Sequence, residues 1–113
     1  MPYDEALAAR VRALLAGEEA ISEKRMFGGL AFLLEGNMAV AASGEGGLLV
    51  RVDPSEGERL VACTAAVPMA MRGREMVGWL RVAEGLESDP ELAAWVRRGV
   101  DYARGLPPKR GRG

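Results

Sequence analysis

Apolar residues recur at helical spacing in two segments, one near each end of the chain. The first spans residues 4–16, with acidic residues in its first turn and Gly17 after its end, which is the pattern of an amphipathic helix. The second follows Ser88-Asp89-Pro90-Glu91, where a capping box and an early proline are typical of a helix start, and it stops at Gly105. The apolar stripe of the first segment consists of Leu7, Val11, Leu14 and Leu15. That of the second consists of Leu92, Trp95, Val96, Val100 and Ala103.

Between these helices the pattern changes to short apolar runs divided by glycine-rich breaks. Three runs, residues 30–34, 38–42 and 48–52, predict strands. Gly36-Asn37 and the run of residues 44–47 supply the positive backbone angles of tight hairpins, and the connections are too short for parallel crossovers. We therefore expect an antiparallel meander.

The second half of the chain predicts a short helix and a further hairpin. Asp53-Pro54-Ser55-Glu56 is typical of a helix start, and the helix continues to Val61. After it, residues 67–71 and 76–82 predict two strands that flank the charged turn Arg72-Gly73-Arg74-Glu75. This hairpin completes the series of elements.

Together these elements predict an α+β fold in the order α-β-β-β-α-β-β-α, a mainly antiparallel sheet with the helices packed on one face. No break in composition divides the chain, so we expect one domain over residues 1–104. Residues 105–113 form a tail whose prolines and basic residues favour disorder. With 113 residues, 49% of them hydrophobic, the chain is long enough for one core.

Composition predicts a cytoplasmic protein that does not enter a membrane. The N-terminus is acidic where an export signal is basic, and no apolar stretch approaches the roughly 20 residues that cross a bilayer. Cys63 is the only cysteine, which fits a reducing compartment. Its apolar neighbours predict a buried, unreactive thiol.

Charge is unevenly distributed, although the net charge is only −1. The last ten residues carry +4, and the remaining 11 basic and 16 acidic residues leave the rest of the chain at −5. Basic residues at turns, strand ends and the tail predict an interaction surface, while interleaved acidic residues favour the alternative of a mixed, solvated surface. The candidate residues are Arg51, Arg72, Arg74, Lys109, Arg110 and Arg112.

The residue types limit the chemistry that the chain can perform. There is no histidine, the commonest general base and metal ligand, and one cysteine cannot build a thiolate cluster. Carboxylate pairs such as Glu18-Glu19 lack the apolar surroundings that acid–base catalysis needs. Gly28-Gly29 precedes a strand, the reverse of a phosphate-binding loop. We therefore expect no catalytic site, no cofactor, no metal and no enzyme activity.

The run Arg25-Met26-Phe27-Gly28-Gly29, placed between a first helix and a meander, resembles the N-terminal domain of the TfoX/Sxy family. The resemblance extends through Glu35-Gly36-Asn37-Met38, residues 48–53 and residues 68–82, and covers roughly residues 4–103. It implies a compact α+β domain similar to the secretion-chaperone class, in which dimers are common. Longer members regulate natural competence with the cyclic-AMP receptor protein and carry a C-terminal domain that we do not find in these 113 residues.

These observations predict a non-enzymatic protein-interaction or regulatory domain, which the resemblance links to transcription regulation. Its expected partner is another protein or a second copy of the chain. Two alternatives remain open: weak nucleic-acid binding through the basic tail, and a small-molecule pocket, although the same residues are typical of an ordinary core. The pocket would be lined by Phe27, Trp79, Met26, Met69, Met71 and Met76.

Overall fold

The computed structural model describes residues 4–26, 28–44, 46–71 and 73–107, and for residues 71 and 75 it describes the backbone alone. Of the residues predicted to carry function, Phe27, Arg72, Lys109, Arg110 and Arg112 lie outside these ranges. The elements are α1 (Glu5–Leu14), β1 (Ile21–Met26), β2 (Gly29–Leu34), β3 (Asn37–Ala42), β4 (Leu48–Arg51), α2 (Pro54–Cys63), β5 (Val67–Met71), β6 (Arg74–Val82) and α3 (Asp89–Arg104).

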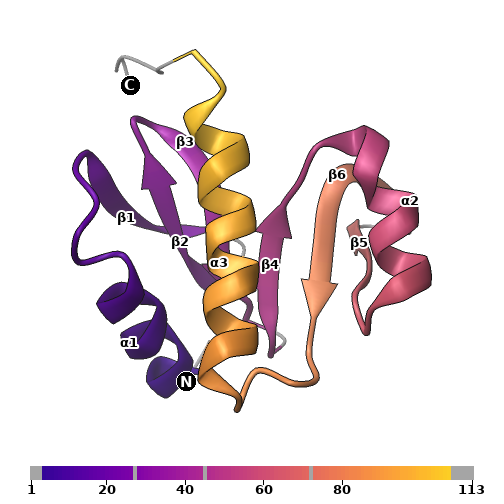
Figure 1. Cartoon of the computed structure of the whole chain (residues 1–113), viewed down its shortest axis with the longest axis horizontal. Coiled ribbons are helices and arrows are strands. Elements are labelled where there is room, and N and C mark those ends of the chain that lie inside the picture. Colours follow the sequence, from indigo (N-terminus) through magenta and orange to yellow (C-terminus); the bar gives the residue numbers. More distant parts are fainter. Residues whose placement is uncertain (1–3, 27, 45, 72, 108–113) are drawn as a thin grey trace.

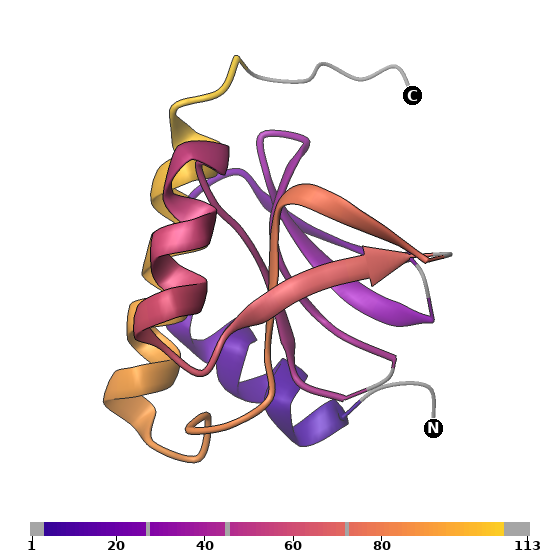
Figure 2. The ribbon, with the colours of Figure 1, turned by 90° about the vertical axis from the view of Figure 1, so that its right-hand side faces the viewer.

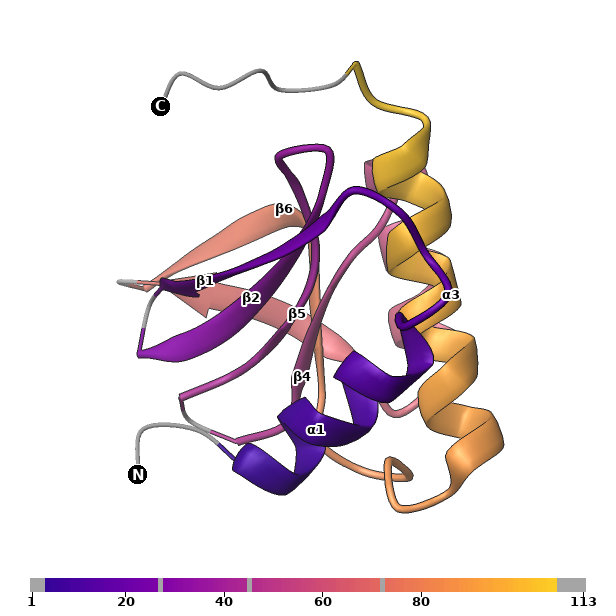
Figure 3. The same cartoon turned by 90° about the vertical axis from the view of Figure 1, so that its left-hand side faces the viewer.

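All six strands form one antiparallel sheet in the order β1-β2-β3-β4-β6-β5 (Figure 1). The chain leaves β4, forms α2 and returns as β5 at the outer edge, and β6 then inserts between β5 and β4. The helices lie on one side of the sheet, and the strands curve away from them on the other (Figure 2, Figure 3). The predicted α+β fold, with an antiparallel sheet and helices on one face, is confirmed.

β1 is the one strand that the apolar pattern did not predict. Four consecutive polar residues, Ser22-Glu23-Lys24-Arg25, lie between its two apolar ends, and all four are exposed. β1 is an edge strand that pairs with β2 alone, so no buried face imposes an alternating pattern on it. Glu23 accepts hydrogen bonds from the Arg12 guanidinium of α1 at 2.6 and 3.0 Å. This ion pair joins the strand to the helix.

Two strand boundaries in the second half of the sheet also differ from the prediction. β6 begins at Arg74 rather than Met76, because its pairing with Met71 of β5 continues up to the turn. Val52 lies just beyond β4, although its N–H still donates to the carbonyl oxygen of Gly78 at 2.8 Å. The sheet pairing is thus longer on β6 and shorter on β4 than expected.

Each helix begins at a residue whose side chain accepts a hydrogen bond from a backbone N–H two or three residues ahead. These residues are Asp4, Asp53 and Ser88, with donor–acceptor distances of 3.1, 2.9 and 3.4 Å. Such caps satisfy N–H groups that have no partner within the helix. All three helix starts were predicted from the sequence. None of the described helices is long and apolar enough to span a membrane.

Cys63 corrects the sequence-based expectation of a buried thiol, because it is exposed at the last position of α2. α2 packs mainly on β6 and β5 at the edge of the sheet, and Leu60 is its buried residue. Leu60 and Ala66 on either side are buried, whereas Ala62 and Ala65 are exposed together with Cys63, because the end of α2 turns away from the core between them.

The helices and the covered face of the sheet share the larger of two hydrophobic clusters. Val11 of α1, Leu60 of α2 and the apolar stripe of α3 pack against alternate strand residues in this cluster. Since neighbouring residues of a strand point to opposite faces, alternate strand residues take part, except that both Ala39 and Val40 of β3 belong to the cluster, where the register with β2 shifts. The strand residues involved include Leu30, Phe32, Leu34, Val40, Ala42, Leu48, Val50, Leu80 and Val82.

α3 lies unusually close to β3 at Gly99, in the middle of the helix. A Cβ at this position would lie 2.5 Å from the carbonyl oxygen of Ala39 and 2.8 Å from Cγ1 of Val40, so the atoms would overlap. Glycine is therefore required by the packing of helix on sheet. Gly57 in α2 has the opposite setting, because a Cβ there would meet nothing within 4 Å.

We expect Gly99→Ala to lower the free energy of unfolding by about 1–3 kcal/mol, because the added methyl group forces α3 away from β3. Gly57→Ala is the matched control and should raise the free energy of unfolding by about 0.5–1 kcal/mol, because alanine is the better helix former where space allows. Urea denaturation of both variants measures the two changes. Equal effects of the two substitutions would contradict the close contact at Gly99.

Two carboxylates are held in their charged form by local hydrogen bonds. The hydrogen bond from Arg12 lowers the pKa of Glu23 below its ordinary value, although partial burial opposes this effect. The pKa of Asp53 is lowered because the N–H and the hydroxyl of Ser55 both donate to its carboxylate. A carboxylate with a lower pKa in the folded than in the unfolded state stabilises the fold while it is ionised.

The stabilisation from these two carboxylates should be complete above about pH 5 and lost as the pH falls through about 4 and below. Asp53→Asn keeps a capping oxygen but cannot ionise. Wild type should therefore be the more stable protein at pH 7, and the difference in free energy of unfolding should shrink toward pH 3. Urea denaturation at both pH values tests this, and a difference that stays constant would rule out the ionised cap.

Candidate functional site

The face of the sheet without helices carries a second, smaller apolar cluster. Ala31, Ala41, Leu49 and Met69 form its centre, each no more than 8% exposed, and it includes no described helical residue. The flanking side chains shield this centre and are themselves partly buried. These flanking residues are Met26, Leu33, Met38 and Trp79. We call this set the second cluster.

The family-like motif lies where β1 turns into β2, and its described glycines have structural roles. Gly28 has a φ of +75°, a conformation that favours glycine. Gly29 lies so close to the carbonyl oxygen of Ala42 in β3 that a Cβ would overlap it. Met26 pairs with Gly29 and packs on the second cluster, while Arg25 is exposed on the opposite face. The two glycines thus permit the tight start of β2, directly before which the sequence had placed them.

Arg51 links the sheet to α3 through two aromatic rings. Its guanidinium carbon lies 5.8 Å from the ring centroid of Trp79, its cross-strand neighbour on β6, and 5.8 Å from that of Tyr102 on α3. Cation–π contacts of this kind contribute about 0.5–1 kcal/mol each at exposed sites. Arg51 therefore helps to hold the fold and is only half-exposed.

Arg74 lies apart from Arg51 and is exposed at the start of β6. Arg51 pairs across the strands with Trp79 of β6. Trp79 is five residues after Arg74, which is roughly 16 Å along the strand at the usual rise per residue. The two described members of the predicted basic surface are thus at different ends of β6. Arg72 and the basic residues of the tail lie outside the described ranges.

Three of the four exposed large apolar side chains among the described residues are on the hairpin of β5 and β6, with Met76 and Val77 adjacent and Val67 farther along, opposite Arg81. Val67, Met76 and Val77 are 49, 36 and 79% exposed, and Leu14 on α1, at 42%, is the fourth large apolar residue in this class. We call Val67, Met76 and Val77 the β5–β6 patch. The pattern of apolar residues did not predict this patch. The lack of any charged residue in β5 was the feature of the sequence that could have indicated it.

The β5–β6 patch borders a groove of about 430 Å³ between α2 and β6. Trp79 and Met76 of the predicted small-molecule pocket line this groove, whereas Met26 and Met69 belong to the second cluster. The structure thus divides the predicted pocket between two places. The apolar lining includes Val61, Ala62, Pro68, Met76, Val77 and Trp79.

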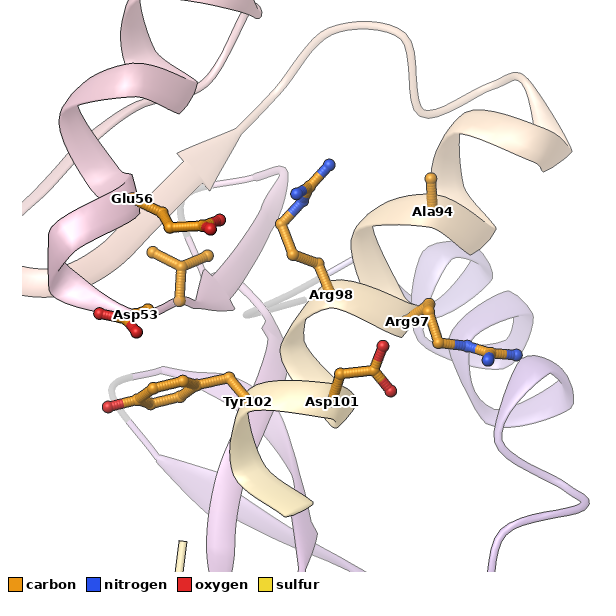
Figure 4. Close-up of a pocket in the computed structure, with 8 residues that line it drawn as sticks. Asp53, Glu56, Ala94, Arg97, Arg98, Asp101 and Tyr102 are labelled. Atoms are coloured by element: carbon orange, nitrogen blue, oxygen red, sulfur yellow. The ribbon is translucent and has the colours of Figure 1, made fainter. Parts of the chain in front are cut away.

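A further groove, of about 480 Å³, lies between α2 and α3 and is lined mainly by charged residues (Figure 4). Arg98 extends toward α2, and Arg97 points away from the other labelled side chains. The guanidinium carbon of Arg98 lies 5.2 Å from the centroid of the Trp95 ring, and its buried Nε has no hydrogen-bond partner among the described residues. The remaining labelled residues are Asp53, Glu56, Ala94, Asp101 and Tyr102.

The acidic side chains of the α2–α3 groove form ion pairs along their own helices. Glu56 pairs with Arg59 at 3.2 Å, and Asp101 pairs with Arg104 at 3.9 Å. In the described ranges no three metal-ligating side chains come together to hold an ion. The groove therefore presents mixed, solvated charge, in contrast to the apolar groove beside the β5–β6 patch.

Comparison with known proteins agrees with this architecture. Neither the curated proteins nor the solved structures include a significant match to the chain. The family model described as the TfoX N-terminal domain matches residues 13–103. This match begins within α1, contains all six strands and ends one residue before the end of α3. The chain therefore belongs to the TfoX N-terminal domain family.

Proposed function

We propose that this TfoX-type domain is a non-enzymatic protein-interaction module with a regulatory role, and that it binds its partner at the β5–β6 patch. The observation that carries the proposal is the exposure of Met76 and Val77, which line a largely apolar groove. Single exposed apolar residues are ordinary in soluble proteins, but a group that adjoins a concave apolar surface is typical of a binding site.

The energetics of burial favour a protein partner at this place. Removing an exposed valine side chain from water contributes about 1.5–3 kcal/mol when it is fully buried, and Val77 has most of its surface available. The lining on the α2 side, Val61 and Ala62, offers further apolar contact without a charged group in the centre. Side chains of another protein supply the complementary apolar surface.

The residue types of the chain support binding rather than catalysis. The sequence contains no histidine, and its one cysteine is exposed at the end of α2. In the α2–α3 groove, the carboxylates of Glu56 and Asp101 are paired with arginines of their own helices. The regulatory role in the proposal rests on membership of the TfoX N-terminal domain family.

A second candidate function is nucleic-acid binding through the tail, which the charge of +4 over the last ten residues favours. Binding of this kind depends steeply on salt, with a log–log slope on the order of −3 to −4 if all four basic groups contact phosphates. It makes no use of the β5–β6 patch. The two candidates therefore respond differently to nuclease and to substitutions in β6.

We expect affinity recovery of the tagged full chain from its native lysate to yield a protein that remains after nuclease treatment. Val77→Lys should reduce this recovery at least tenfold, because a charge in the centre of an apolar contact removes more than about 1.4 kcal/mol of binding free energy. Mass spectrometry identifies and quantifies the partner.

Leu14→Lys is the matched control, because it replaces an equally large apolar residue that is exposed on α1. Lysine is also favourable in the last turn of a helix. Its recovery should equal that of the wild type. A loss of recovery after nuclease treatment would support nucleic-acid binding through the tail instead. A partner whose recovery is unaffected by Val77→Lys would exclude the β5–β6 patch as its binding site.

A further inference from the structure

We propose that the protein bound at the β5–β6 patch is a second copy of this chain, and that the two copies are related by a two-fold axis passing near Val77. This inference rests on the proposed function and adds the identity and geometry of the partner. It follows from the shape of the patch, from the charges on its two sides and from the construction of the sheet edges.

The patch is complementary to itself in shape. Val77 projects with 79% of its surface exposed, and the groove lined by Val61, Ala62 and Met76 lies directly beside it. In a two-fold dimer the same patch is used by both copies, so it must contain both the projecting and the receiving part. Val77 of each copy then enters the groove of the other.

The charges that border the patch are also complementary to themselves. Glu58 lines the groove on the α2 side, and Arg74 lies at the opposite end, where β6 extends away from the helices (Figure 2). Both are exposed, and neither forms an ion pair or hydrogen bond with another described residue. A two-fold axis between them places Glu58 of each copy opposite Arg74 of the other.

Neither edge of the sheet is suited to strand pairing between two copies, which favours contact through the side chains of the patch. The β1 edge carries Glu23, Lys24 and Arg25, and charges on an edge strand oppose strand pairing. The β5 edge is uncharged, but Pro68 has no N–H to donate to an added strand. The copies are therefore held through side chains in the groove rather than through a continuous sheet.

The other surfaces of the described chain are less suited to this contact. The centre of the second cluster is already shielded, with no member more than 8% exposed, so covering it adds little apolar burial. The groove between α2 and α3 is lined by charged residues such as Glu56, Arg98 and Asp101. Only the β5–β6 patch combines exposed apolar residues, a groove and unpaired opposite charges in the part of the chain that the structure describes.

Sedimentation velocity of the purified full chain over a wide concentration range tests the proposal. We expect the mass to rise from 12.1 kDa to twice this value with concentration. Val77→Lys should weaken dimerisation at least tenfold, because it places two like charges near the axis, whereas Leu14→Lys should not. A wild-type chain that stays monomeric, or a dimer unaffected by Val77→Lys, would overturn the proposal.

Charge reversal tests the two-fold geometry itself. Glu58→Lys and Arg74→Glu should each weaken the homodimer about fivefold or more, because every dimer contains the altered pair twice. The double variant should regain the wild-type affinity, and a mixture of the two single variants should form a heterodimer in which both pairs are again opposite in charge. Failure of both rescues would refute the arrangement, with circular dichroism confirming that each variant is folded.

The outcome separates this inference from the proposed function. A purified chain that is monomeric, but whose recovery of another protein from lysate is abolished by Val77→Lys, would leave the β5–β6 patch as a binding site and exclude the second copy as its partner. A dimer that responds to Val77→Lys and is rescued by the charge exchange would identify the chain as its own partner.

Discussion

The packing of α3 on β3 is the contact on which the rest of the structure depends. Gly99 brings the helix backbone so near to Ala39 that no side chain fits between them. At this distance the apolar stripe of α3 reaches between the strand residues of the larger cluster, and α3 contacts β2, β3 and β4. α1 packs beside α3, while α2 is left to cover the outer strands. The close contact thus decides which part of the sheet each helix can cover.

The exposed surface proposed for a partner is a consequence of this distribution of helices. Because β6 inserts between β4 and β5, the strand after α2 becomes the edge of the sheet. α2 contacts β6 and β5 without covering Val77, which remains exposed beside the groove. The opposite edge is protected by charges on β1. Among the described residues, the exposed apolar side chains of the proposed binding surface therefore lie at one edge of the sheet.

The family-like motif and the proposed function lie in different parts of the chain. The described residues of the motif around Gly28 and Gly29 shape the turn between β1 and β2, and Met26 fills the second cluster. Arg51, predicted for an interaction surface, lies between the rings of Trp79 and Tyr102. These residues explain why the fold is recognised in the sequence. The proposed partner contact instead depends on side chains that the fold leaves exposed.

Local periodicity in the sequence determined the three helices with their caps, the meander from β2 to β4 and the hairpin of β5 and β6. Each of these signals acts within a few residues, through helical spacing, turn conformation or a capping oxygen. The polar strand β1 carried no such signal, because an edge strand exposed on both faces needs no alternation. The exposure of Cys63 was mispredicted although Leu60 and Ala66 beside it are buried, because the end of α2 turns away from the core between them.

Only the tertiary structure decided the order of strands, the contact at Gly99 and the place where apolar residues stay exposed. Val77 and Leu80 are both apolar residues of β6, yet one is 79% exposed and the other is buried under the helices. What distinguishes them is which distant segments lie against each face, and that depends on pairings between residues far apart in the chain. The sequence by itself therefore determined the elements, and the packing between them determined the candidate site.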